Sequence, residues 1–113
     1  VLLSATRAEL DRVTLEWDPR VALGVVLAAA GYPLNPRKGD AITGLPADAA
    51  DAMVFHAGTA ARDGAIIATG GRVLNVTARG ETLSDAQARA YAMVDAIDWP
   101  EGFHRTDIGW RAL

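Results

Sequence analysis

Gly70, Gly71 and Arg72 form the stretch of this sequence whose residue types most directly suggest chemistry. Backbone N–H groups around glycines can form a concave nest that binds an anion, and a neighbouring guanidinium can add two hydrogen bonds to a phosphate. The triplet therefore predicts a small phosphate-binding corner. The alternative is an ordinary two-residue hairpin turn followed by an exposed arginine, because Gly-Gly pairs are common in such turns.

The other candidate residues give weaker signals. Arg37 and Lys38 lie in a segment rich in proline and glycine, and they are either solvated charges or a further part of an anion site. His56 and His104 are far apart in sequence. A histidine in the core or at its rim explains each of them without catalysis, because a general base needs a positioned partner.

The carboxylates do not follow the spacing of metal ligands, and we predict no metal site and no catalytic residue in this chain. Asp18 with Arg20, and Asp107 with Arg111, are interpreted as local ion pairs. The sequence also contains no nucleotide-binding glycine-rich motif and no zinc-protease motif.

The composition is that of one globular domain. Of the 113 residues, 50% are hydrophobic and 22% charged, and the net charge is −3. This charge argues against a nucleic-acid partner, which usually requires a basic face. No apolar run approaches the roughly 20 residues that span a bilayer, so we expect no membrane partner. The absence of cysteine fits a cytoplasmic location.

The chain pattern predicts an α+β fold in which antiparallel strands position these residues. A helix is expected at 2–12 and a linker at 14–20, followed by a core strand at 21–30 and a long loop at 31–46 that contains a short strand at 41–43. Three strands at 53–58, 65–69 and 72–78 are expected to form a meander, with Asp63-Gly64 and Gly70-Gly71 as its turns. Simple alternation places Arg72 on the same face as Leu74 and Val76.

The clearest helix is predicted at 83–97. Thr82 is a candidate N-cap and Asp85 stands three residues later, which is a variant of the capping box. Apolar residues then recur at helical spacing up to Ile97, before Trp99-Pro100 ends the pattern.

Several motifs together resemble the C-terminal part of the glycinamide ribonucleotide synthetases, also called phosphoribosylamine–glycine ligases. These motifs stand in one order and cover nearly the whole chain: EWDPR (16–20), GVVLAAAGYP (24–33), HAGT (56–59), GGRVLNVTARG (70–80), AYAMVDAI (90–97) and DIGWRA (107–112). One departure lies after GYP, where Leu34, Asn35 and Pro36 replace the family's usual residues.

The resemblance implies an ATP-grasp ligase of purine biosynthesis. Such an enzyme joins glycine to phosphoribosylamine and splits ATP into ADP and phosphate, with glycyl phosphate as the intermediate. ATP and Mg²⁺ (or Mn²⁺) would be bound mainly outside this segment. Residues 1–18 would end the ATP-grasp region, and 19–113 would form a small β-rich C-terminal domain, a half-barrel like the hybrid motif of related proteins.

The resemblance also sharpens the interpretation of Arg72. In related enzymes, basic residues at the corresponding strand start contact the 5′-phosphate of a ribonucleotide substrate, which implies substrate-binding roles for Gly70, Gly71 and Arg72, with Lys38 as a weaker candidate. Partners would be phosphoribosylamine, glycine, ATP and the remainder of the same polypeptide.

Two other functions stay open at this point. The chain could be a purely structural domain that braces the ATP-grasp lobe, or an independent domain that binds a phosphorylated metabolite. Because the sequence opens on Val1, Leu2 and Leu3 in the middle of a helical pattern, we expect it to be a piece of a longer polypeptide that is inactive alone.

Overall fold

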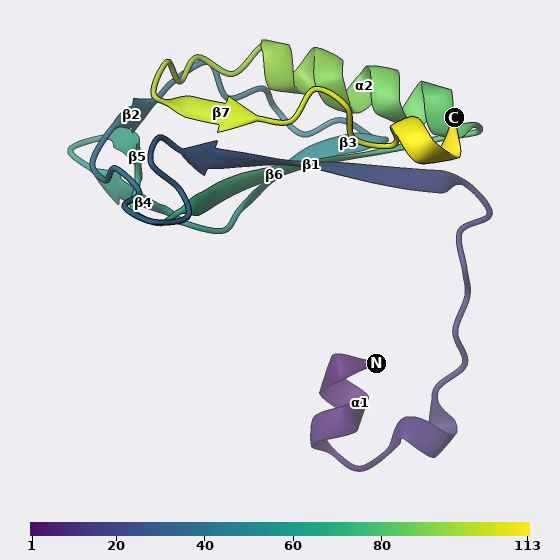
Figure 1. Ribbon diagram of the computed structural model, residues 1–113. Coiled ribbons are helices and arrows are strands. Elements are labelled where there is room, and N and C mark those ends of the chain that lie inside the picture. Colours follow the sequence, from purple (N-terminus) through teal and green to yellow (C-terminus); the bar gives the residue numbers. More distant parts are fainter.

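The computed structural model describes residues 1–113 and contains two antiparallel sheets and one long helix (Figure 1). The strands are β1 (Val21–Ala29), β2 (Ala41–Ile42), β3 (Ala52–His56), β4 (Thr59–Arg62), β5 (Ala65–Ala68), β6 (Arg72–Gly80) and β7 (Gly102–His104). The helical segments are α1 (Leu2–Thr6), η1 (Leu10–Arg12), α2 (Leu83–Asp95) and η2 (Trp110–Ala112). The predicted α+β class is therefore confirmed, as are the core strand near 21–30 and the short strand near 41–43.

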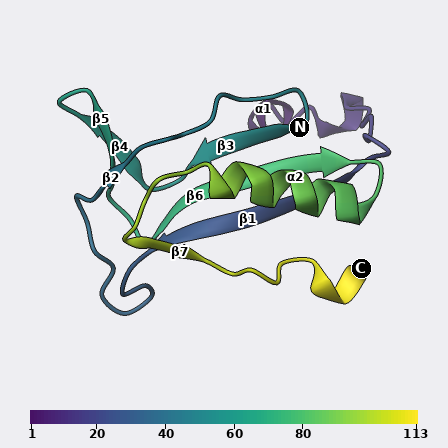
Figure 2. The same ribbon diagram turned by 90° about the horizontal axis from the view of Figure 1, so that it is seen from above.

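The larger sheet has the strand order β3-β6-β1-β7, and every neighbouring pair is antiparallel. Helix α2 lies along β1 and β6 on one side of this sheet (Figure 2). No helix packs against the opposite side, which we call the open face.

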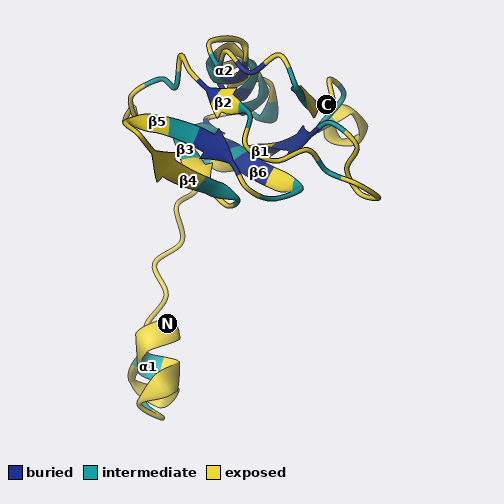
Figure 3. Ribbon diagram, turned by 90° about the vertical axis from the view of Figure 1, so that its left-hand side faces the viewer, coloured by how far each residue is buried: buried dark blue, intermediate teal, exposed yellow.

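The core lies between the sheet and α2, where alternate residues of the two central strands point toward the helix. In Figure 3, stretches of the central strands β1 and β6 have the dark blue colour of buried residues. The residues that form this layer are Leu23, Val25 and Leu27 of β1, Leu74, Val76 and Ala78 of β6, and Ala86, Ala90 and Val94 of α2. Small helix residues allow the helix to approach the sheet closely, so α2 fixes which face of β6 remains available for function.

The predicted capping of α2 is confirmed. The Thr82 hydroxyl accepts a hydrogen bond from the Asp85 N–H at 3.2 Å, and the Asp85 carboxylate accepts one from the Thr82 N–H at 3.1 Å. Two otherwise unpaired backbone donors are satisfied in this way, which determines where the helix begins. The Thr82 hydroxyl, which also donates to the Asp85 carboxylate at 2.7 Å, and then the Thr82 N–H lower the pKa of Asp85.

The predicted meander is wrong. Asp63-Gly64 does form a two-residue turn with positive φ at both positions, but it joins β4 to β5. These two strands and β2 form a separate three-stranded sheet. Strand β3 pairs with β6 instead of β5, and Gly70-Gly71 carries the chain from one sheet to the other. Strand β4 was not predicted, because TAAR shows no apolar alternation.

The N-terminal residues form an arm that extends away from the rest of the structure, on the side of the larger sheet opposite α2 (Figure 1). The predicted helix over 2–12 is wrong: α1 and η1 are separate, and Ala8 between them has φ of 54°. No residue of either segment is buried, so no packing offsets the cost of forming a longer helix. None of the helices has the length and apolarity needed to cross a membrane.

Candidate functional site

A bulge in β6 determines where the Arg72 side chain lies. Leu27 of β1 pairs with Leu74, but the next residue, Ala28, pairs with Arg72, so Val73 is an extra residue in β6. One inserted residue reverses the alternation of side chains beyond it. Arg72 therefore lies on the open face, and the prediction that it shares a face with Leu74 and Val76 is wrong.

Arg72 lines a pocket of about 310 Å³ on the open face. The residues around it come from β1, the 31–40 loop, β6, β7 and the segment after β7: Gly24, Val26, Ala28, Tyr32, Arg72, Phe103, His104, Arg105 and Ile108. We call this the Arg72 pocket. Its floor is apolar because the β1 residues that face it, at alternate positions, are Gly24, Val26 and Ala28.

The Arg72 guanidinium has no partner in the structure. It is exposed, and none of the ion pairs or side-chain hydrogen bonds involves it. An unpaired guanidinium beside an apolar floor is suited to bind an anion, because five donors remain available in a fixed planar array.

Close packing explains the two glycines before Arg72. A Cβ atom on Gly71 would lie 2.5 Å from Cδ2 of Tyr32, and one on Gly70 would lie 3.3 Å from the Cα of Gly58. Neither residue has positive φ, and the pair connects two sheets. The geometry is thus neither the left-handed nest nor the two-residue hairpin turn considered from the sequence.

The 31–40 loop lies beside the same crossing. The Gly39 N–H donates a hydrogen bond to the Ala68 carbonyl at 2.7 Å, and Pro36 lies next to Gly71. Arg37 forms an ion pair with Asp40 at 2.7 Å. Lys38 is exposed, has no ion-pair partner and does not line the Arg72 pocket.

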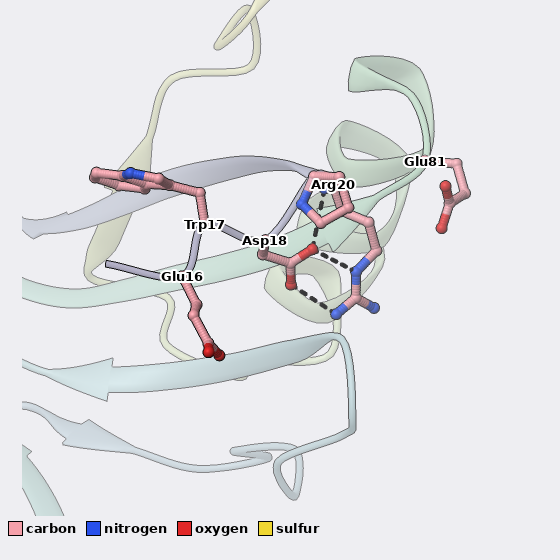
Figure 4. Close-up of a pocket in the computed structure, with 6 residues that line it drawn as sticks. Glu16, Trp17, Asp18, Arg20 and Glu81 are labelled. Carbon is pink, nitrogen blue, oxygen red and sulfur yellow. Dashed lines mark hydrogen bonds and ion pairs between the residues drawn. The ribbon is translucent and has the colours of Figure 1, made fainter. Parts of the chain in front are cut away.

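A second group of charges lies at the opposite end of the β1–β6 pair. We call it the junction cluster, and it consists of Asp18, Arg20, Asp51, Arg79 and Arg89. The Asp18 carboxylate accepts hydrogen bonds from Arg20 Nε at 2.9 Å and Nη2 at 2.7 Å, as Figure 4 shows. It also accepts one from Arg79 Nη1 at 2.8 Å, which ties the N-terminal linker to β6.

Asp51 completes the junction cluster. It accepts a hydrogen bond from Arg20 Nη1 at 2.6 Å and one from Arg79 Nη2 at 3.3 Å, and Arg89 of α2 lies 3.7 Å away. Two carboxylates are therefore shared among three guanidiniums from the linker, β6 and α2. The predicted Asp18–Arg20 pair is confirmed as part of this larger network.

The network shifts the ionisation of its members. The side-chain hydrogen bonds from Arg20, followed by the bond from the Arg20 backbone N–H, hold the pKa of Asp18 well below its usual value. The pKa of Arg20 is raised, chiefly by its hydrogen bonds to Asp18. Both groups are therefore charged at neutral pH, and each charge is compensated by a partner within the fold.

The prediction for Asp107 is wrong. This carboxylate binds Arg105 through Oδ1 at 2.8 Å and Oδ2 at 2.6 Å, and these bonds lower the pKa of Asp107. Gly109 follows with φ of 90° and turns the chain, so the Arg111 guanidinium lies over the Trp110 ring at 5.1 Å. The Arg111 guanidinium thus makes a cation–π contact with Trp110 in place of an ion pair with Asp107.

The two histidines do not form a catalytic pair with each other. His56 is exposed at the end of β3, and its Nδ1 lies 2.8 Å from the Thr59 hydroxyl. His104 is half-buried in β7, with its ring 6.1 Å from that of Tyr91. No group of three or more histidine, aspartate or glutamate side chains could hold a metal ion.

Sequence reasoning missed part of the Arg72 pocket. Tyr32, Phe103 and Arg105 come from segments about 40 and 30 residues away from Arg72 in the chain and meet it only because β1 lies between β6 and β7. No local signal marks these residues, although the aromatic Phe103 in a short strand-like segment is compatible with one side of a pocket.

Comparisons with known proteins give one consistent result. The family described as "Phosphoribosylglycinamide synthetase, C domain" matches residues 22–111. A phosphoribosylamine–glycine ligase of Brucella melitensis is 55% identical over 112 residues, which is 97% of this chain and 26% of that protein. A ligase of the same name from Escherichia coli O6:H1 is 54% identical over 113 residues, with 98% and 26% coverage.

A solved structure supports the same similarity. The crystal structure of a phosphoribosylamine–glycine ligase from Thermotoga maritima aligns with a TM-score of 0.78 and 35% sequence identity, covering 95% of this chain and 27% of that one. The chain thus spans about a quarter of the length of the relatives that it matches.

Proposed function

The chain belongs to the phosphoribosylglycinamide synthetase C-domain family, and we propose that it forms the substrate-phosphate side of the cleft in an ATP-dependent phosphoribosylamine–glycine ligase. In this proposal the reaction is the cytoplasmic step of purine biosynthesis that joins glycine to 5-phosphoribosylamine. Residues 1–18 would end the ATP-grasp region, and 19–113 would form the C-terminal domain.

The observation that carries the proposal is the placement of Arg72. It is an arginine without a carboxylate partner, and the bulge at Val73 turns it onto the only large sheet face that α2 does not cover. A 5′-phosphate would supply the missing negative charge through bidentate hydrogen bonds. Gly70 and Gly71 let the crossing pack closely beside Arg72, and Lys38 on the adjacent loop would add a weaker, solvent-screened attraction.

The position of the N-terminal arm also supports a cleft on the open face. The arm leaves the sheet on the side of the open face, so the preceding part of a longer polypeptide could cover that face and close a cleft over Arg72 (Figure 1). Trp17 and the apolar residues of the arm are exposed, as expected of surfaces that contact another lobe.

The chemistry itself would take place on groups from elsewhere in the ligase. ATP would supply the leaving group that glycine's carboxylate lacks, by forming glycyl phosphate, which the sugar amine then attacks with release of phosphate. This chain offers no cluster of carboxylates that fits Mg²⁺ or Mn²⁺, so ATP and the metal are assigned to the rest of the polypeptide. The isolated chain is expected to bind at most and to catalyse nothing.

A purely structural role is the alternative, and the junction cluster is the observation that favours it. Its charges link the linker to β6 and α2, which would brace the connection to a preceding lobe even if the open face met no ligand.

Substitution of Arg72 distinguishes these functions. In the full-length ligase, Arg72→Ala should raise the KM for phosphoribosylamine about 30- to 150-fold, the equivalent of about 2–3 kcal/mol for a lost charged hydrogen-bond partner. The KM values for ATP and glycine should hardly change. Arg62→Ala is the matched control, because Arg62 is also exposed and unpaired but lies on β4. Unchanged kinetics with a lowered melting temperature would support the structural alternative instead.

A further inference from the structure

We infer that the Arg72 pocket binds the pentose ring of the ligand as well as its phosphate, with Phe103 and Arg105 of the β7 region as the sugar-contacting side. The inference rests on the proposed function and extends it from one arginine to a ligand orientation. Phosphate would lie at Arg72, and the ring would lie across β1 toward Phe103.

The strand register gives the spacing. Ala28 pairs with Arg72 on one side and with Phe103 on the other, so these three residues form one row across β6, β1 and β7. Strands lie about 4.8 Å apart, which separates the backbones of Arg72 and Phe103 by about 10 Å. The residue between them is alanine, and Gly24 lies further along the same face, so the middle of the pocket is left free of large side chains.

The two arginines of the pocket differ in charge balance. Arg72 has no partner, whereas Arg105 donates from Nε at 2.8 Å and from Nη2 at 2.6 Å to the Asp107 carboxylate. This pair is close to neutral overall, so of the two pocket arginines it is Arg72 that attracts the negative phosphate. Nη1 of Arg105 makes no hydrogen bond in the structure and remains a donor suited to an uncharged hydroxyl. The pocket therefore has a distinct anionic end and a neutral polar end.

Phe103 supplies an apolar wall between those ends. The residue is 47% exposed although it lies in a strand, and it borders the apolar floor of Val26 and Ala28. An aromatic face of this kind packs against the C–H side of a sugar ring, while the ring hydroxyls remain free to accept or donate hydrogen bonds. A phosphorylated pentose meets both requirements, and inorganic phosphate meets only one.

The test compares two probes on the full-length ligase. Isothermal titration calorimetry would give Kd values for inorganic phosphate and for ribose 5-phosphate with the wild type and each variant. Wild type should bind ribose 5-phosphate more tightly than phosphate. Phe103→Ala should weaken ribose 5-phosphate about tenfold, leave phosphate binding unchanged, and so remove most of the difference between the probes. Phe103→Leu should fold as the wild type does and lose a smaller part of the difference in Kd between the two probes.

Phe55→Ala is the matched control, because Phe55 is equally exposed at 49% and lies on the same sheet but on β3, outside the pocket. It should leave both Kd values unchanged. Equal Kd values for the two probes in the wild type, or equal weakening of both by Phe103→Ala and Phe103→Leu, would overturn the sugar pocket. So would unchanged binding in both variants, which would mean that another lobe covers Phe103. The proposed function fails separately, if Arg72→Ala leaves phosphate binding unchanged.

Discussion

The β1–β6 strand pair has arginines at both ends, and the two ends differ in what surrounds them. Near Val21 and Gly80, Arg20 and Arg79 share the carboxylates of Asp18 and Asp51 at 2.6 to 3.3 Å. At the other end, Arg72 faces an apolar floor and has no carboxylate partner. The contrast separates charges that the fold already uses from a charge that remains available for a ligand.

The difference arises from local structure and not from the residue type. At the junction, the linker folds back so that Asp18 meets both Arg20 and Arg79. At the Arg72 end, the bulge turns the side chain away from α2 and toward the open face. Burial without a partner would be costly for a guanidinium, and exposure on a concave face avoids that cost while keeping the charge accessible.

Removing Asp51 should give the largest loss of stability in this comparison. Asp51→Ala leaves three guanidiniums with one carboxylate, and we expect a loss of about 1–2 kcal/mol in the free energy of unfolding, because the site is partly exposed. Thermal unfolding of the 113-residue chain measures it, with Asp95→Ala as the control, since Asp95 is exposed and unpaired. An unfolding curve that matches the control would mean that the junction cluster does not hold the fold.

Gly71→Ala should have a smaller effect that reports on packing beside Arg72. The new Cβ would lie 2.5 Å from Cδ2 of Tyr32, and the half-exposed ring can move away, so we expect a loss of about 1 kcal/mol. In a double-mutant cycle, Gly71→Ala should cost almost nothing when Tyr32 is already alanine. If the cost stays the same in both backgrounds, a cause other than this contact requires the glycine.

The acid sensitivity of the junction cluster should be the smallest of these effects. The folded-state pKa of Asp18 is lower than its value of about 3.9 in an unfolded chain, so its contribution to stability is complete above that value and is lost as the pH falls toward the folded pKa. Asp18→Asn should therefore be less stable than wild type at pH 6, and the gap should narrow between pH 4 and pH 2. Urea unfolding across this range checks it; a constant gap would contradict the assignment.

The sequence predicted those parts of the fold that depend on local signals. The Thr82 and Asp85 side chains mark the start of α2, and the apolar run after Pro19 marks β1. The register between distant strands was not predictable, because the bulge at Val73 depends on how β1 and β6 pack together. Strand β4 was missed because its pairing with β5 compensates for a sequence without strand character.

For the candidate site, too, the sequence indicated only the features that depend on neighbouring residues. The sequence predicted a phosphate-binding corner at Gly70-Gly71-Arg72. The two glycines, however, are explained by close contacts with Gly58 and Tyr32, which exist only in the folded chain. Asp107 was expected to form a local ion pair with Arg111, but a left-handed glycine at 109 redirects the chain and Asp107 pairs with Arg105 instead. Side chains that meet across strands carry no signal that a single sequence reveals.

A crystal structure of the full-length ligase with an unreactive analogue of its phosphoribosyl product would test the central claim most directly. We predict that two nitrogens of the Arg72 guanidinium lie about 2.7–2.9 Å from oxygens of the 5′-phosphate, while Arg79 keeps its bonds to Asp18 and Asp51. A phosphate bound elsewhere, with Arg72 paired to a carboxylate of another lobe, would contradict the claim.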